Sequence, residues 1–216
     1  MNVRTKKLTT VAMLCAIAYL VMVIGRIPVV LFLKYDPKDV IITMGGFMFG
    51  PIASLAISVI VSLVEMFTVS DTGLIGCIMN ILSSCSFACT AAVIYKKKHT
   101  VGGAVGGLAV GLVLMTGIML LWNYFVTPIY MGYPREAVAE LLVPAFLPFN
   151  LLKGGLNAAI TMLIYKPLVT ALRKARLIPE STGHSSKRSG KIGIVLVSGL
   201  VLVSCILLVL VMKGVL

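Results

Sequence analysis

The sequence predicts an all-α integral membrane protein, and two properties of its composition lead to this fold class. Apolar residues make up 59% of the 216 residues, and charged residues make up only 12%. Soluble domains contain about 45–50% apolar and about 25% charged residues. The mean hydropathy is +1.07, so a soluble fold of this length would expose large apolar areas to water. A lipid bilayer is the solvent that suits such a chain.

Six apolar runs have the length of membrane-spanning helices, which need about 20 apolar residues each. They are Leu8–Gly25, Val40–Val69, Leu74–Tyr95, Val101–Val126, Val143–Val169 and Ile192–Met212. The second run is long for one span and short for two. Pro51 lies in its middle, lacks a backbone N–H and suits the first turn of a new helix. We therefore expect a short helix over residues 39–49 and a second helix over residues 51–69.

The basic residues predict how these helices are oriented. The net charge is +12, and Lys and Arg occur in short runs between the apolar segments: Arg4/Lys6/Lys7, Lys96/Lys97/Lys98, Arg173/Lys174/Arg176 and Lys187/Arg188/Lys191. Such runs mark cytoplasmic loops, which favours a multi-pass plasma-membrane protein over nucleic-acid binding. With the second run split, the N-terminus is cytoplasmic and the C-terminus lies outside. An unsplit chain with an external N-terminus accounts for the charges equally well, and Gly50-Pro51 favours the split.

The chain divides into three parts. Residues 1–178 form a transmembrane body of six helices that we expect to bind the substrate. Residues 179–191 are rich in Ser, Gly and basic residues, as in a flexible cytoplasmic linker. Residues 192–212 form an accessory transmembrane helix without acidic, basic or amide side chains, so we expect it to face lipid.

Few polar side chains occur within the apolar runs, where their cost in lipid demands a reason. They are Glu65, Asn80, Asn123, Asn150, Lys153 and Asn157. They supply no Ser–His–Asp set, metal cluster or carboxylate pair, and no phosphate-binding loop of the form G-x-x-x-x-G-K-[ST] occurs. The five cysteines lie in apolar runs without His or acidic partners. We therefore expect neither an enzyme nor a bound metal or other cofactor.

Asn150, Lys153 and Asn157 share one helix face, because they are spaced i, i+3 and i+7. Their helix runs inward from the outer surface, and Asn123 lies near the outer end of the preceding, antiparallel helix. The topology therefore brings Asn123, Asn150 and Lys153 to a similar depth. This arrangement predicts a pocket in the outer half of the membrane, lined by amides and one cation.

Other side chains near this depth allow two interpretations each. Asn80 is a further candidate for substrate binding, but Asn side chains also hold helices together in lipid, and Asn157 is open to the same alternative. Trp122 and Tyr124 flank Asn123 and are either pocket walls or part of an interfacial aromatic belt. Glu65 lies near the outer end of its helix and is left without a role.

The first outer loop, Arg26–Asp39, contains the motif Leu33-Lys34-Tyr35-Asp36-Pro37. The motif combines an aromatic ring, charges of both signs and a rigid Pro, which suits either a lid over the pocket or an ordinary solvated loop. Two further motifs follow in order: Trp122-Asn123-Tyr124-Phe125 with Thr127-Pro128, and Pro148-Phe149-Asn150-Leu151-Leu152-Lys153-Gly154. Together, over about residues 5–175, they resemble the riboflavin-specific substrate-binding (S) components of energy-coupling factor (ECF) transporters.

The resemblance implies a subunit that binds riboflavin from outside and carries it without chemical change. Its partners would be a transmembrane coupling subunit and two ATPase subunits. Matched by motif, Asn123, Asn150 and Lys153 would hydrogen-bond the polar edge of the isoalloxazine ring. Tyr35 and Asp36 would belong to the loop that closes over the vitamin. The last helix has no counterpart in the six-helix pattern of this family.

The resemblance also implies a partner-binding face on the first helix, where the family carries small residues as Ala-x-x-x-Ala. Ala12 and Ala16 have this spacing, although such pairs also mediate ordinary helix packing. Three alternatives to a riboflavin subunit stay open: an S-component for another vitamin, a small intramembrane enzyme and a structural membrane subunit.

Overall fold

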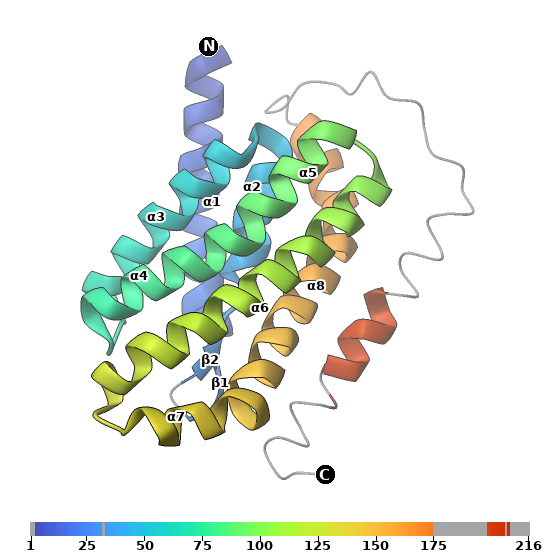
Figure 1. Ribbon diagram of the computed structural model, residues 1–216. Helices are drawn as coiled ribbons and strands as arrows, with labels where there is room; N and C mark the ends of the chain where they lie inside the picture. Colours follow the sequence, from blue (N-terminus) through green and yellow to red (C-terminus); the bar gives the residue numbers. More distant parts are fainter. Residues whose placement is uncertain (1–2, 32, 175–197, 206, 208–216) are drawn as a thin grey trace.

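The computed structural model describes residues 3–31, 33–174, 198–205 and 207, and residues 3–174 form a helical bundle (Figure 1). Helix α1 (Val3–Gly25) leads into a β-hairpin of β1 (Ile27–Val30) and β2 (Leu33–Tyr35). Then follow α2 (Lys38–Phe49), α3 (Pro51–Thr68), α4 (Gly73–Ser84) and α5 (Thr90–Lys98). The rest of the bundle is α6 (Val101–Met131), α7 (Arg135–Leu141) and α8 (Leu147–Lys174).

Two of these helix pairs are continuous, because a π-helical turn joins their members. The turn Cys85–Cys89 joins α4 to α5, and the turn Leu142–Phe146 joins α7 to α8. Within the described residues, five helices are therefore long and apolar enough to cross a membrane: Arg4–Gly25, Pro51–Thr68, Gly73–Lys98, Val101–Ile129 and Arg135–Tyr165. Helix α2 has 12 residues, about 18 Å at 1.5 Å per residue, which is too short to span.

The predicted division at Gly50-Pro51 is confirmed. Helix α2 ends at Phe49, and Pro51 is the first residue of α3. Between them Gly50 has a φ of 91°, a conformation that is strained for any residue with a Cβ. The short α2 and the five long helices belong to the bundle that residues 3–174 form. The described part of a further helix starts at Ser198, and much of the predicted run Ile192–Met212 lies outside the described residues.

The sequence did not predict the hairpin within Arg26–Asp39. Its strands pair antiparallel, with Ile27 opposite Tyr35 and Pro28 opposite Lys34. Leu33 and Tyr35 are buried while Lys34 between them is exposed, as alternation in a strand requires. Strands of four and three residues are too short to produce a recognisable period in the sequence.

Two helices extend further than their apolar runs. Helix α6 continues past Val126 to Met131 and includes Pro128, which costs one hydrogen bond near the helix end. The last span of the bundle begins at Arg135 instead of Val143. Its π-helical turn accommodates Pro144, and the amphipathic first turns carry the charges that hid them from the hydropathy pattern.

The helices form one bundle, and glycines let two of them approach closely. A Cβ on Gly107 would lie 2.8 Å from the backbone oxygen of Ala91, and one on Gly111 would lie 2.6 Å from that of Phe87. These contacts bring α6 against the α4–α5 helix, as small residues do in membrane bundles. The N-terminus, the α5–α6 connection and the end of α8 lie at one end of the bundle (Figure 1). The hairpin, the α3–α4 connection and α7 lie at the other end.

Candidate functional site

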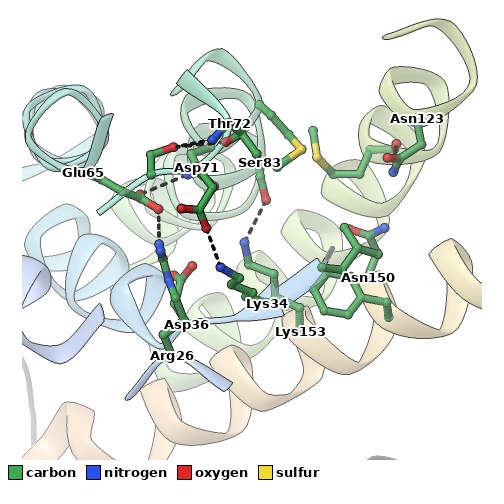
Figure 2. A pocket seen from close by; sticks show the side chains of 16 residues that line it. Arg26, Lys34, Asp36, Glu65, Asp71, Thr72, Ser83, Asn123, Asn150 and Lys153 are labelled. Carbon is green, nitrogen blue, oxygen red and sulfur yellow. Dashed lines mark hydrogen bonds and ion pairs between the residues drawn. The ribbon is translucent and has the colours of Figure 1, made fainter. Parts of the chain in front are cut away.

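A cavity of about 280 Å³ lies at the hairpin end of the bundle, between the hairpin, α3, α4, α6 and α8 (Figure 2). Many of its lining side chains are polar or charged. The lining residues are Arg26, Leu33, Lys34, Asp36, Glu65, Ser70, Asp71, Thr72, Met79, Asn80, Ser83, Met119, Asn123, Phe149, Asn150 and Lys153. The cavity volume is near the lower end of the range for ligand pockets, about 300–1,000 Å³.

Five residues selected from the sequence line this one cavity. Asn123 comes from α6, Asn150 and Lys153 from α8, Asn80 from α4 and Asp36 from the segment after the hairpin. Helices α6 and α8 pack against each other, and Asn123 and Asn150 lie on the same side of the cavity (Figure 2). The predicted amides and Lys153 therefore line one cavity, but the expectation of a single cation is wrong, because Arg26 and Lys34 line the cavity as well.

The two amides are held by their own helices. Asn123 Nδ2 donates to the backbone oxygen of Met119 at 2.8 Å, and Asn123 Oδ1 accepts from Thr127 Oγ1 at 2.9 Å. Asn150 Nδ2 donates to the backbone oxygen of Phe146 at 2.8 Å. Phe146 ends the π-helical turn. Among the described residues, Asn150 Oδ1 has no protein partner, so this oxygen is available as an acceptor for a ligand that enters the cavity.

Lys153 is buried and forms an ion pair with Asp39. Its Nζ lies 3.5 Å from Asp39 Oδ2 and 3.4 Å from Ser83 Oγ. Asp39 is fully buried and accepts further hydrogen bonds from Ser84 Oγ at 2.5 Å and from Asn157 Nδ2 at 3.3 Å. The sequence placed Asp39 at the end of an external loop. It also predicted a helix that begins there, and Asp39 does lie in the first turn of α2, where it neutralises the lysine at the cavity.

Glu65, which the sequence left without a role, accepts hydrogen bonds from three side chains. Lys38 Nζ donates to Glu65 Oε2 at 2.5 Å and Asn80 Nδ2 donates to the same oxygen at 3.0 Å. Arg26 forms an ion pair with the other carboxylate oxygen. Lys38 is fully buried and lies 3.8 Å from Asp36. Asp36, Asp39 and Glu65 thus face three cations, so buried charge in this region is balanced.

Tyr35 lies behind the cavity wall and does not line it. Its hydroxyl donates to Asn157 Oδ1 at 3.1 Å, and Asn157 donates in turn to Asp39. Burial, together with the carboxylates of Asp39 and Asp36, raises the pKa of the Tyr35 phenol above its ordinary value. Tyr35 therefore stays protonated and ties the hairpin to α8 and α2. Asn157 acts as a structural link, which was one of its two interpretations.

Pocket walls were one of the two interpretations of Trp122 and Tyr124, and neither residue lines the main cavity. Trp122 lines a separate cavity of about 20 Å³. The Tyr124 ring packs edge-on against Phe125, and the guanidinium of Arg135 lies 5.7 Å above its centroid. The reason is helical geometry: neighbours in sequence point about 100° to either side of Asn123. Met119, one turn away from Asn123, is the α6 residue that lines the cavity beside it.

A further ion pair, more exposed than those described above, joins two segments that line the cavity. Lys34 in β2 donates to Asp71 Oδ2 in the α3–α4 connection at 3.0 Å (Figure 2). Both side chains are solvent-exposed, 40% for Lys34 and 79% for Asp71. The hydrogen bond and charge of Lys34 hold the pKa of Asp71 below its ordinary value. The hairpin is thereby tethered across the cavity to the connection between two helices.

The residues that sequence reasoning missed are those with distant partners. Arg26, Lys34, Glu65, Asp71 and Ser83 all line the cavity. The partner of Arg26 is 39 positions away in sequence, and the partner of Lys34 is 37 positions away. Their charges gave no hint of this pairing, because charged residues near helix ends are expected in water. Among the described residues, no His, Cys, Asp and Glu side chains are grouped to hold a metal ion.

Comparison with known proteins identifies the family of this chain. The family model described as "ECF transporter, substrate-specific component" matches residues 6–165. The chain belongs to this family. A solved chain described by "Structure and mechanism of the S component of a bacterial ECF transporter" superposes with a TM-score of 0.68. It is 29% identical, and the match covers 79% of this chain and 99% of that one.

Curated relatives carry names that specify a ligand. The riboflavin transporter RibU of Staphylococcus aureus (strain TCH60) is 30% identical over 181 residues, covering 79% of this chain and 94% of the relative. The riboflavin transporter FmnP of Bacillus subtilis (strain 168) is 27% identical, covering 81% of this chain and 99% of the relative. This membrane protein is therefore a substrate-specific transporter component and not an enzyme, and the family implies no cofactor.

Proposed function

We propose that this chain captures riboflavin for an ECF-type importer in the plasma membrane. The observation that carries the proposal is the cavity in which Asn123, Asn150 and Lys153 meet. The relatives named as riboflavin transporters support the choice of ligand. The vitamin is transported without chemical change, so the site has to recognise and bind it but needs no reactive group.

The chemistry of the cavity suits riboflavin. One end of its flat ring carries an imide N–H between carbonyl oxygens, and its ribityl chain carries hydroxyl groups. Asn150 Oδ1 is an acceptor for the imide, and the Lys153 ammonium is a donor for a carbonyl. Met79, Met119 and Phe149 line the cavity and offer apolar contact to the ring faces. Asn80 and Asp36 also line the cavity and are the residues that we expect to hydrogen-bond the ribityl hydroxyl groups.

The proposal includes partners and an orientation. The sequence lacks a phosphate-binding loop for ATP, so transport energy must come from other subunits. We expect a transmembrane coupling subunit and two ATPase subunits. Ala12 and Ala16 are exposed on α1, away from the cavity, and suit the contact with the coupling subunit. The cavity faces outward, and the bundle end that carries the N-terminus and Lys96–Lys98 faces the cytoplasm.

Riboflavin binding to the purified protein tests the proposal. We expect yellow colour or flavin fluorescence in the purified protein, and saturable quenching of riboflavin fluorescence when flavin-free protein is titrated. Thiamine and biotin, tested in parallel, represent an S-component for a different vitamin. Thermal stabilisation by one of these vitamins, without riboflavin quenching, would support the alternative and contradict a riboflavin subunit.

A further inference from the structure

The helix beyond residue 197 has two different faces. Ser198 is only 6% exposed, and Leu202 and Cys205 are partly buried. Leu200, Val203 and Leu207 are 69%, 56% and 47% exposed. The first set follows the spacing i, i+4 and i+7 of one helix face, and the second set follows another. The sequence predicted a helix that faces lipid, and the structure shows that one of its faces packs on protein.

The packed face meets α8 at a glycine. A Cβ on Gly155 would lie 3.1 Å from Cys205 Sγ, so the absence of a side chain there is what admits the cysteine. At the neighbouring Gly154, the Leu112 side chain of α6 occupies the space that a side chain would need, because a Cβ there would lie 2.2 Å from Leu112 Cδ1. Consecutive glycines on α8 therefore let two different helices approach its backbone, the usual role of small residues in membrane helix contacts.

The same face reaches the apolar cluster that supports the hairpin. Leu202 and Cys205 pack against a buried cluster that includes Val29, Leu33 and Tyr35 of the hairpin, and Leu152 and Leu156 of α8. Leu33 also lines the cavity. The hairpin, α8 and the last helix thus share one apolar cluster, and one of its members, Leu33, belongs to the cavity wall.

We propose that the helix described over residues 198–205 and 207 is a seventh structural helix of this protein, docked on α8 at Gly155, which holds the hairpin closed beside the cavity. The family model ends at residue 165, so this helix is an addition to the shared body. The added apolar contacts stabilise the closed hairpin, and a bound ligand leaves more slowly. This last step rests on the proposed riboflavin binding, while the docking itself does not.

A disulfide tests the docking without any ligand. In a disulfide, the Cβ of one cysteine lies about 3.0 Å from the Sγ of the other, given an S–S bond of about 2.04 Å. Gly155→Cys should therefore form a disulfide with Cys205 on mild oxidation. A specific protease site is placed within residues 180–190, and Cys15, Cys77, Cys85 and Cys89 are replaced by Ala. After cleavage, the two fragments should stay together on a non-reducing gel and separate when reduced.

The matched control carries Cys205→Ser in addition to Gly155→Cys and must give separate fragments. Separate fragments from folded Gly155→Cys protein would overturn the docking. A second measurement needs no cysteine at position 155. An affinity tag on the last helix should retain the cleaved, otherwise unaltered body in mild detergent. Gly155→Leu should abolish this retention, whereas Gly117→Leu should not, because a Cβ on Gly117 meets nothing within 4 Å. Equal retention by both leucine variants would also contradict the docking.

Ligand kinetics test the effect on the hairpin. Protein that ends at residue 179 should release riboflavin several-fold faster than the full chain, with a nearly unchanged association rate, in stopped-flow fluorescence. Gly155→Leu should reproduce the faster release in the full chain. Unchanged release in both would overturn the hairpin-holding role. If the full chain fails to bind riboflavin, the proposed function is contradicted, and the disulfide result still decides the docking.

Discussion

The ammonium of Lys153 on α8 and the carboxylate of Asp39 on α2 form a buried pair, with 3.5 Å between Nζ and Oδ2. Their side chains are 7% and 0% exposed. A lysine without a partner at membrane depth would destabilise the protein, and its replacement by an apolar residue would increase stability. Here the partner makes the lysine necessary for stability too, since removal of one member of a buried pair leaves an uncompensated charge, at a cost of about 3–5 kcal/mol.

Lys153→Met should therefore reduce both ligand binding and stability. Loss of the donors to a buried ligand carbonyl costs about 1.5–3 kcal/mol, or about tenfold to a hundredfold in riboflavin affinity. The double variant Lys153→Met/Asp39→Asn removes both charges and should regain thermal stability without regaining affinity. Fluorescence titration and thermal unfolding of the purified variants separate the two effects. Wild-type affinity in the stable double variant would exclude Lys153 as a ligand-binding residue.

Sequence analysis located the helices and the amide face because both depend on local periodicity. The division at Gly50-Pro51 follows from the missing N–H of Pro51, and the shared face of Asn150 and Lys153 follows from helical spacing. The meeting of α6 with α8 follows from their antiparallel order. These inferences needed no knowledge of any contact between residues distant in sequence.

The polar network could not be predicted in the same way. Asn157 and Asp39 are 118 positions apart, and Tyr35 and Asn157 are 122 positions apart. A charge near a helix end looks the same in sequence whether it meets water or a buried counter-ion. The hairpin was missed because its register depends on burial of Leu33 and Tyr35 against α8, and Trp122 was misplaced because adjacency in sequence is not adjacency on a helix.

The ion pair between Lys34 and Asp71 should slow the release of ligand. Asp71→Asn removes the charge that tethers the hairpin to the α3–α4 connection, so the riboflavin dissociation rate should rise a few-fold. Both residues are exposed, so the fold should be unaffected, and thermal unfolding serves as the control. Glu136→Gln, at an exposed acidic residue outside the cavity lining, should leave the dissociation rate unchanged. Equal rates in wild type and Asp71→Asn would show that the pair does not restrain the hairpin.

The same pair predicts the sign of a pH effect. Lys34 lowers the pKa of Asp71 from its ordinary value of 3.8. A carboxylate with a lowered pKa contributes fully above its ordinary value, and its contribution is lost as the pH falls through the lowered one. The contribution of this pair to the wild-type dissociation rate should therefore be complete, and independent of pH, between about pH 5 and pH 8. An increase in rate caused by loss of the pair should appear only below the ordinary value, and Asp71→Asn should lack it.

Charge pairing at the cavity predicts discrimination against the phosphorylated vitamin, FMN. Each cation that lines the cavity has a carboxylate partner: Arg26 with Glu65, Lys34 with Asp71, and Lys153 with Asp39. A phosphate with a charge of about −1.5 to −2 would lose water without gaining an uncommitted cation. FMN should bind at least about tenfold more weakly than riboflavin. Asp71→Asn leaves Lys34 without its carboxylate partner and should reduce the ratio of the FMN to the riboflavin dissociation constant. The further change Lys34→Gln should restore this ratio. A ratio near one in the wild type would contradict the prediction.

The arrangement of the bundle predicts which of its ends faces the cytoplasm. The N-terminus and the α5–α6 connection lie at one end, and the cavity lies at the other (Figure 1). Single cysteines at Thr100 and at Ser186, in protein without native cysteines, should resist membrane-impermeant thiol reagents in intact cells and react after permeabilisation. A cysteine at the exposed Asp71 should react in intact cells. The opposite pattern would invert the orientation and place the cavity in the cytoplasm.

Enlarging the exposed small residues of α1 should separate uptake from binding. Ala12 and Ala16 are exposed and lie four residues apart on one face, whereas Ala18 on the same helix is fully buried. Ala12→Leu/Ala16→Leu should abolish riboflavin uptake in cells through steric exclusion of the coupling subunit, with unchanged riboflavin affinity of the isolated protein. Ala109→Leu makes the same change at an exposed alanine of α6 and should leave uptake intact. Joint loss of uptake and binding in the α1 variant would instead assign this face to packing within the protein.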